Sequence, residues 1–282
     1  MGGVSTPGLV LDGARYRVAR AGSGPPVLLL HGFTGAAEAW EPWLGALANA
    51  HEVIAPDLLG HGGTDAPEVP ARYAAERQVA DLAAALDDLG IGRAAVVGYS
   101  MGARLALAFA AAHPGRVERL VLESGSPGIA GEAERAGRRA ADEALARRIE
   151  RDGMAAFVEE WERLPLFAAQ ARLPEEVRRR QREQRLANRP QGLAASLRGF
   201  GQGVQPALHA ALPGLAMPVL LVAGAEDDKY ARLAREMAEA IPGAELEIID
   251  GAGHVPHLEQ PERFRRRAEG FLGAARRARA EG

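Results

Sequence analysis

The chain contains the stretch Val96-Val97-Gly98-Tyr99-Ser100-Met101-Gly102-Ala103-Arg104, which predicts a buried strand, a sharp turn and the start of a helix. Gly98 and Gly102 each lie two residues from Ser100, where side chains would collide if a strand met a helix so abruptly. Ser100 would begin the helix, and the N–H of Met101 would then point at an oxygen that develops negative charge beside it. The pattern predicts a serine hydroxyl held out at the carboxyl end of a strand.

Strands and helices are expected to alternate on both sides of this turn. Apolar runs predict strands at residues 27–30, 53–55, 94–97, 117–122, 219–223 and 246–249, after a short strand pair between residues 9 and 18. Helical spacing predicts helices at residues 40–48, 73–89, 101–112 and 230–240, and a last helix after residue 261. This alternation favours an α/β fold with a mostly parallel central sheet and helices on both faces.

The alternation is interrupted between about Gly125 and Gln205, where no apolar strand occurs and Arg, Glu and Ala are abundant. Several short helices are expected there, because helix-breaking residues recur at Gly128, Gly131, Gly153, Pro165, Pro174 and Pro190. We predict a core formed by residues 1–124 and 207–282, and a helical lid formed by residues 125–206. A lid inserted at the carboxyl edge of the sheet would cover the site into which Ser100 opens.

The composition limits the possible classes of function. The sequence has 282 residues, a formal net charge of −3 and no cysteine. It can bury one α/β domain with an insertion, carries no field that would attract nucleic acid, and has no thiol for a disulfide framework or a metal site. Residues 1–7 show no signal-peptide pattern, and no apolar run approaches the ~18 residues of a membrane helix. We expect a cytoplasmic protein, a monomer or weak homo-oligomer, without nucleic-acid or membrane partners.

A serine hydroxyl becomes reactive when a base takes its proton and an acid fixes the tautomer of that base. Candidates for both follow strands in the last part of the chain, at the sheet edge where Ser100 is expected. The acid is Asp227, Glu226 or Asp228, and we favour Asp227 because it lies deep enough in the turn after residue 224 to face inward. The alternative is that these acids only cap the helix that follows.

The base is expected to be His254, which closes the loop after the strand at residues 246–249. His257 is the alternative, but it would head the final helix. A second oxyanion donor is sought in His31-Gly32-Phe33-Thr34-Gly35, which follows the strand at residues 27–30. There the amide of Phe33 could face that of Met101, unless the segment is an ordinary turn between a strand and a helix.

The oxyanion segment at residues 31–33, the glycine-flanked Ser100, and the later Asp227 and His254 resemble the α/β-hydrolase superfamily over essentially the whole chain. Four motifs resemble one family within it, the MenH enzymes of the menaquinone pathway: residues 98–104, 160–167, 196–206 and 227–230. The resemblance implies a lyase that removes pyruvate from 2-succinyl-5-enolpyruvyl-6-hydroxy-3-cyclohexene-1-carboxylate. It also implies that no metal or organic cofactor takes part.

The implied substrate is a small polycarboxylate, so its pocket needs fixed cations, and arginine can grip a carboxylate through two hydrogen bonds. Arg104 lies one helical turn after Ser100 and could reach the same cavity. The resemblance further implies substrate-binding roles for Tyr99, Arg138, Trp161 and Arg185. For the two lid arginines a solvated helix face is the alternative, and Arg135, Arg139 and Arg182 are close rivals.

In the mechanism that the resemblance implies, Asp227 and His254 make Ser100 a general base, while the amides of Phe33 and Met101 stabilise the developing negative charge. The first alternative is a hydrolase that uses the same three residues for acyl transfer on an ester, a lactone or a vinylogous diketone. A ligand receptor or scaffold with idle catalytic residues is the second alternative.

Overall fold

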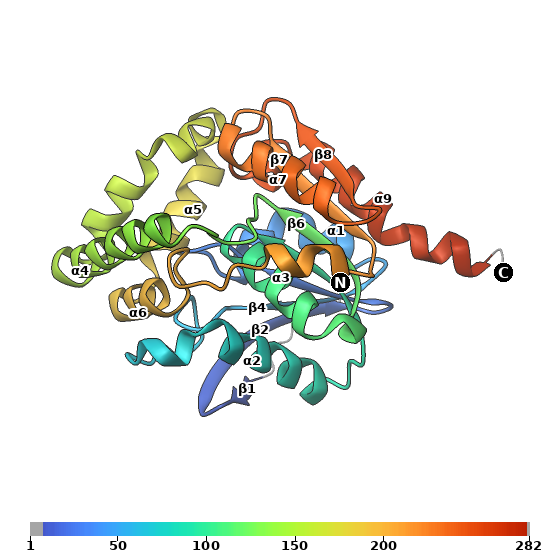
Figure 1. Cartoon of the computed structure of the whole chain (residues 1–282), viewed down its shortest axis with the longest axis horizontal. Coiled ribbons are helices and arrows are strands. Elements are labelled where there is room, and N and C mark those ends of the chain that lie inside the picture. Colours follow the sequence, from blue (N-terminus) through green and yellow to red (C-terminus); the bar gives the residue numbers. More distant parts are fainter. Residues whose placement is uncertain (1–7, 281–282) are drawn as a thin grey trace.

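The computed structural model describes residues 8–280, so residues 1–7, where no signal-peptide pattern was found, lie outside it. The centre is an eight-stranded sheet of order β1-β2-β4-β3-β5-β6-β7-β8. Figure 1 shows the sheet at the centre of the molecule with helices packed around it. The strands are β1 Gly8–Leu11, β2 Ala14–Gly22, β3 Pro26–Leu30, β4 Glu52–Pro56, β5 Ala94–Tyr99, β6 Val117–Glu123, β7 Val219–Gly224 and β8 Glu245–Ile249. Only the β1–β2 and β2–β4 pairs are antiparallel, so the predicted parallel sheet is confirmed from β4 to β8.

Helices cover both faces of the sheet because its central strands are apolar on both sides. On β3, Leu28 and Leu30 belong to one buried cluster, whereas Val27 and Leu29 belong to the other, as the two-residue period of a strand requires. The first cluster lies beneath α2 Ala75–Asp88, α3 Met101–Ala112 and α7 Asp228–Ala240. The second lies beneath α1 Glu41–Leu47 and α9 Pro261–Ala280, which follows the short α8 Pro256–Glu259.

Two helix boundaries differ from the prediction for local reasons. α2 begins at Ala75 and not at Tyr73, because residues 70–73 form a 3-10 turn and Ala74 is extended (ψ 148°). α7 begins at Asp228, two residues earlier than predicted, because the side chain of Asp227 accepts a hydrogen bond from the N–H of Tyr230.

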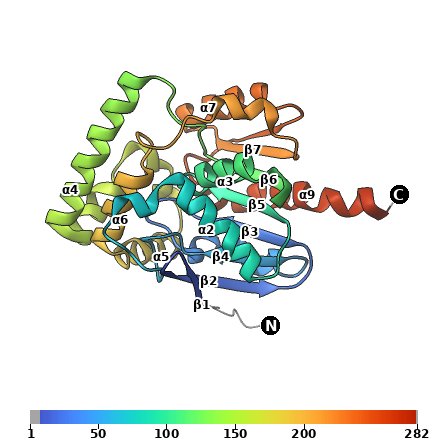
Figure 2. The same cartoon turned by 60° about the horizontal axis from the view of Figure 1, so that its bottom comes forward.

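Five helical elements lie between β6 and β7, and the four before the short 3-10 helix η5 His209–Gly214 form one group beside the sheet (Figure 2). They are α4 Glu132–Glu162, η4 Pro165–Arg172, α5 Glu175–Leu186 and α6 Pro190–Phe200. The predicted interruption at Gly153 is confirmed, because Gly153 has non-helical dihedral angles (φ 76°, ψ 176°) and divides α4 into two helical segments at a kink. Apolar side chains on both sides of the kink, such as Ile149 and Val158, pack on Leu193 and Leu197 of α6.

In the helix α6 of this lid, the backbone itself packs against the backbone of the core. A Cβ atom on Gly192 would lie 2.3 Å from the carbonyl oxygen of Gly60, and one on Gly199 would lie 2.2 Å from that of Pro70. Both positions therefore require glycine. The division of the chain at residues 124/125 and 206/207 stays a prediction. None of the helices within residues 8–280 has the length and apolar character that a membrane crossing needs.

Candidate active site

The turn at Ser100 is built as the glycine spacing predicts. Ser100 has φ 52° and ψ −106°, a strained conformation for a residue with a side chain, and it stands between β5 and α3 as the N-cap. A Cβ on Gly98 would lie 2.4 Å from the carbonyl oxygen of Gly102, and one on Gly102 would lie 2.0 Å from that of Leu30. The two glycines thus permit the abrupt turn that presents the hydroxyl.

The structure brings Ser100, His254 and Asp227 together at the carboxyl ends of β5, β8 and β7. Ser100 Oγ lies 3.0 Å from His254 Nε2, and His254 Nδ1 lies 2.7 Å from Asp227 Oδ2. Both His254 and Asp227 are buried. Because a carboxylate only accepts, Nδ1 carries the proton and donates to Asp227, which leaves Nε2 free to accept the serine proton.

The rival side chains point elsewhere. Glu226 is exposed and pairs with Arg172 at 2.8 Å, and Asp228 is exposed at the first turn of α7. His257 is buried beside Glu123, with Nδ1 2.8 and 2.9 Å from the two carboxylate oxygens. Asp227 serves both as the partner of His254 and as a helix cap, the two roles that the sequence left as alternatives. Its other oxygen, Oδ1, accepts a hydrogen bond from the N–H of Tyr230 at 3.2 Å and caps α7.

The loop after β3 approaches Ser100 closely. A Cβ on Gly32 would lie 2.5 Å from the Tyr99 ring and 3.5 Å from the Cβ of Ser100, so the approach requires glycine. The carbonyl oxygen of Gly32 accepts from His31 Nδ1 at 2.8 Å and from the N–H of Gly35 at 2.9 Å. Since a trans peptide is planar, the N–H of Phe33 points in the opposite direction from this doubly held carbonyl.

His31 has a fixed tautomer in this arrangement. Its Nε2 accepts from the N–H of Leu58 at 2.9 Å, so Nδ1 carries the proton and donates to Gly32. Complete burial lowers the pKa of His31 below its ordinary value and keeps the ring neutral. The second candidate donor, Met101, is the first residue of α3, so its N–H has no acceptor within the helix.

A cavity of about 570 Å³ opens beside Ser100, between the sheet edge and the lid. Its apolar wall is formed mainly by Phe33, Leu145, Phe157, Leu164, Leu166, Phe167 and Leu197. Its charged side chains are four cations, Arg104, Arg138, Arg148 and Lys229, and two anions, Asp142 and Glu160. The excess of cations suits an anionic ligand with an apolar body.

Arg104 lies on the cavity wall as predicted, but part of its guanidinium is already bound. Nη1 donates to the carbonyl oxygen of Phe200 at 3.0 Å and to Gln205 Oε1 at 2.6 Å. Burial lowers the pKa of Arg104 to about 10, so it remains a cation at neutral pH. Within residues 8–280, Nε and Nη2 have no hydrogen-bond partner and are available to a ligand.

The two predicted lid arginines differ. Arg138 lines the cavity and holds the buried Asp142 at 2.8 Å, whereas its rivals Arg135 and Arg139 do not line it. Arg185 is absent from the wall of this cavity. It is buried behind Phe167, whose ring centroid lies 5.6 Å from its guanidinium, and it pairs with Glu162 at 3.0 Å.

The aromatic predictions lie on the cavity wall. Trp161 packs against Phe33, Phe157 and Phe167 with ring centroids 5.3–5.5 Å apart. Its indole N–H is buried and has no partner among the described residues, so it is an unpaired donor in the cavity wall. Tyr99 lies with its ring 5.5 Å from that of His254, and burial raises its pKa well above the ordinary value, so it stays protonated.

Other cavity residues were not selected from the sequence. Lys229 lines the cavity, and partial burial together with the neighbouring Arg138 lowers its pKa. The signal that could have found it is that it is the only lysine in the sequence. Gln202, which donates to the Tyr230 hydroxyl at 3.0 Å, lies on the same wall, and its signal was its place in the motif at residues 196–206. Within residues 8–280, no three His, Cys, Asp or Glu side chains are grouped as metal ligands would be.

Comparison with known proteins agrees with this geometry. The family model described as the alpha/beta hydrolase fold matches residues 25–261, and the chain belongs to the α/β-hydrolase fold family. The predicted fold class is therefore confirmed.

Two relatives narrow the assignment. A Bacillus subtilis protein, provisionally named a 2-succinyl-6-hydroxy-2,4-cyclohexadiene-1-carboxylate synthase, is 44% identical over 93% of this chain and 96% of the relative. The structure of MenH from S. aureus has a TM-score of 0.86 and 33% identity over 91% of this chain and 97% of that one. Within the α/β-hydrolase fold family, the chain belongs to the MenH family.

The same fold also carries esterases. A thermophilic esterase from Thermogutta terrifontis, solved with malate bound, has a TM-score of 0.84 and 29% identity, over 95% of this chain and 98% of that one. Similarity of fold alone therefore does not separate the lyase from a hydrolase.

Proposed function

We propose that this chain eliminates pyruvate from 2-succinyl-5-enolpyruvyl-6-hydroxy-3-cyclohexene-1-carboxylate and forms 2-succinyl-6-hydroxy-2,4-cyclohexadiene-1-carboxylate. The observation that carries the proposal is the hydrogen-bonded series Ser100, His254 and Asp227 at the mouth of a cavity whose charged groups are mostly cations. Membership of the MenH family supports the same reaction.

In this reaction Ser100 acts as a base through His254. Nε2 of His254 accepts the serine proton, and Oγ removes the ring proton at C2, next to the succinyl carbonyl. The electron pair forms the C2–C3 double bond, the C3–C4 double bond moves to C4–C5, and the bond from C5 to the enolpyruvyl oxygen breaks. The leaving enolate takes up a proton and becomes pyruvate. Asp227 holds His254 in the required tautomer and stabilises its charged form.

The remaining groups bind charge. The N–H groups of Phe33 and Met101 would stabilise the oxyanion that develops on the succinyl carbonyl. Arg104, Arg138 and Lys229 would hold the carboxylates, because the cavity places them on a wall shared with Ser100. Trp161 and Tyr99 would pack on the ring. For Arg185 we propose an indirect role, since it supports Phe167 from behind the cavity wall.

The test is release of pyruvate from the enolpyruvyl substrate by the purified protein, followed with a coupled pyruvate assay. We expect Ser100→Ala to lower kcat by roughly 10³-fold or more, because the reaction loses its base. Absence of pyruvate above background in the wild type, or an undiminished rate in Ser100→Ala, would refute the proposal.

The second candidate is a serine hydrolase that acts on an ester, a lactone or a vinylogous diketone. It is favoured by the nucleophile-ready geometry of Ser100 and by the similarity to an esterase. A covalent acyl group on Ser100, detected by mass spectrometry after rapid quenching, would support the hydrolase. Rejection of simple activated esters alongside rapid pyruvate release would support the lyase.

A further inference from the structure

The oxyanion loop, residues 31–36, is held by a lid residue through two peptide units that are hydrogen-bonded to each other. The carbonyl oxygen of Gly32 accepts a hydrogen bond from the N–H of Gly35 at 2.9 Å. The same peptide unit that contains the Gly32 carbonyl also contains the N–H of Phe33. The N–H of Gly35 shares its peptide unit with the carbonyl group of Thr34. The carbonyl oxygen of Thr34 accepts a hydrogen bond from Asn188 Nδ2 at 2.9 Å. A continuous series of donors and acceptors thus connects Asn188 with the candidate oxyanion N–H.

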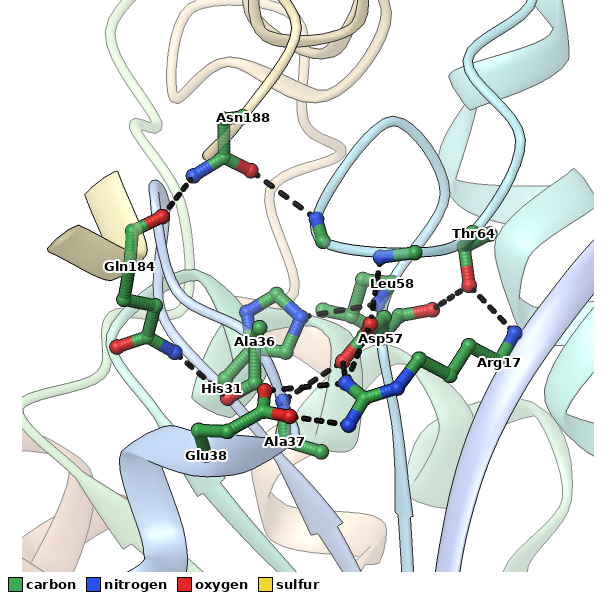
Figure 3. A network of polar contacts seen from close by, with 12 residues as sticks. Arg17, His31, Ala36, Ala37, Glu38, Asp57, Leu58, Thr64, Gln184 and Asn188 are labelled. Atoms are coloured by element: carbon green, nitrogen blue, oxygen red, sulfur yellow. Dashed lines mark hydrogen bonds and ion pairs between the residues drawn. The ribbon is translucent and has the colours of Figure 1, made fainter. Parts of the chain in front are cut away.

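Asn188 lies in the short link between α5 and α6 and is buried. Its Oδ1 accepts from the N–H of Gly62 at 3.1 Å, in the loop after β4 (Figure 3). Together with the bond to the Thr34 carbonyl oxygen, this contact makes one side chain join the lid to two core loops. Gln184, one turn earlier on α5, donates to the carbonyl oxygen of Ala36 at 3.2 Å at the other end of the oxyanion loop. Two lid side chains therefore hold the oxyanion loop, at the carbonyl oxygens of Thr34 and Ala36.

The loop needs such support because its backbone is strained. Thr34 has φ 68°, a conformation that a β-branched residue rarely adopts, and its side chain is buried. A strained residue keeps its conformation when the surrounding structure restrains it. The hydrogen bond from Asn188 to the Thr34 carbonyl supplies a restraint at the strained residue itself.

A further contact joins the same loop to the lid on the cavity side. The Phe33 ring packs edge-on against Phe157 and Trp161 of α4, with centroids 6.4 and 5.5 Å apart, and against His61 of the core at 5.7 Å. Lid groups therefore flank the residue that carries the oxyanion N–H on both sides.

We infer that Asn188 is a positioning residue for the oxyanion hole, so that the docked lid orients the Phe33 N–H for catalysis. The role rests on the proposed function, in which that N–H stabilises the oxyanion. Asn188 contacts neither the cavity nor the reacting atoms. It acts through the Thr34 and Gly32 peptides, whose hydrogen bonds polarise one another in the same direction.

The experiment compares Asn188→Ala and Asn188→Asp with the control Arg189→Ala. Asn188→Asp keeps the acceptor for Gly62 but lacks the donor for Thr34. Arg189 is the next residue and also joins the lid to the core, at the carbonyl oxygen of Thr64, without touching the oxyanion loop. The measurements are kcat and KM for pyruvate release, and the hydrogen-exchange rate of the Gly35 amide, whose bond to Gly32 closes the turn.

We expect both Asn188 variants to lower kcat about 10-fold, less than the roughly 10²–10³-fold of losing an oxyanion donor outright, with KM within about twofold of wild type. Gly35 exchange should rise about 10-fold in both, and Arg189→Ala should change neither quantity. The inference is overturned if Gly35 exchange stays at the wild-type rate, or if kcat falls equally in Arg189→Ala.

Asn188 also donates to the carbonyls of Gln184 and Arg185 at the end of α5. If this capping were its only role, exchange would rise in α5 while Gly35 stayed protected, which would also overturn the inference. If the wild type releases no pyruvate, the proposed function fails, and the exchange rate of Gly35 in the three variants still decides whether Asn188 holds the loop.

Discussion

At the scale of single residues, Asp227 carries two structural duties with two different oxygens. Oδ2 accepts from His254 and Oδ1 accepts from the N–H of Tyr230. The sequence presented these duties as alternatives, catalytic acid or helix cap. The structure shows that one carboxylate can satisfy both, because the turn after β7 places it between the imidazole and the first turn of α7.

Asp227→Asn separates the two duties. Asparagine is as good an N-cap as aspartate, so α7 should keep its stability, whereas Asp227→Ala should lose about 1 kcal/mol. With Oδ1 still capping the helix, the amide nitrogen of the substituted side chain faces His254 Nδ1 and forces the imidazole proton onto Nε2. We expect Asp227→Asn to lower kcat for pyruvate release by roughly 10³–10⁴-fold, by analogy with other serine triads, at a nearly unchanged melting temperature. An active Asp227→Asn enzyme would contradict the proposed role.

At the scale of elements, two glycines of α4 differ in backbone conformation, one helical and one at the kink between the two helical segments. Gly137 and Gly153 both have open space where a Cβ would be added. Gly153 has φ 76° and marks the bend, whereas Gly137 lies in the regular part of the helix. The bend lets the end of α4 bring Phe157 and Trp161 over the cavity.

These glycines should respond to alanine in opposite ways. Gly137→Ala should stabilise α4 by about 0.5–1 kcal/mol, because alanine loses less backbone entropy in a helix. Gly153→Ala should destabilise it by about 1–3 kcal/mol, because φ 76° with ψ 176° is a conformation that strains any residue with a Cβ. Hydrogen exchange of α4 amides measures both effects, with exchange in β5 as the internal reference. Equal changes of the same sign would show that the bend does not depend on Gly153.

At the scale of the whole molecule, the lid is joined internally by ion pairs in addition to its apolar packing. Arg198 of α6 donates to Glu143 at 2.8 Å and to Glu150 of the same helix α4 at 2.8 Å. The hydrogen bonds from Arg198 and Arg147 lower the pKa of Glu143 to about 2, and Arg198 lowers the pKa of Glu150. Among the described residues, the carboxyl groups with a lowered pKa lie in the lid, except for Glu262; the lid members are Glu132, Glu143, Glu150, Asp152 and Glu176.

Acid should therefore loosen the lid before the core. A carboxyl whose pKa is lower in the folded state contributes stability above its unfolded pKa near 4.5, and that contribution is lost as the pH falls toward 2. Between about pH 5 and pH 2, we expect exchange in α4 and α6, corrected for its intrinsic pH dependence, to rise more than exchange in β5. Arg198→Met should remove most of this difference. Simultaneous opening of lid and core would contradict the prediction.

The sequence alone determined the features that depend on neighbouring residues. The glycine spacing around Ser100, the apolar runs and the order of serine, acid and histidine could be recognised without a structure, because turns and strands are set by local sterics and periodicity. The same local patterns sufficed for the α/β fold, for the placement of Ser100, Asp227 and His254 near one another, and for Arg104 on the cavity wall.

Only the tertiary structure decided which long-range partners these residues meet. Packing on α6 joined the two segments of α4 into one layer across the kink at Gly153, and the pairing with Glu162 turned Arg185 away from the main cavity while Arg138 stayed on its wall. The contact of Asn188 with Thr34 joins residues 154 positions apart and leaves no local pattern. Such contacts depend on how separate elements dock, and docking is governed by the summed burial and hydrogen bonding of the whole molecule.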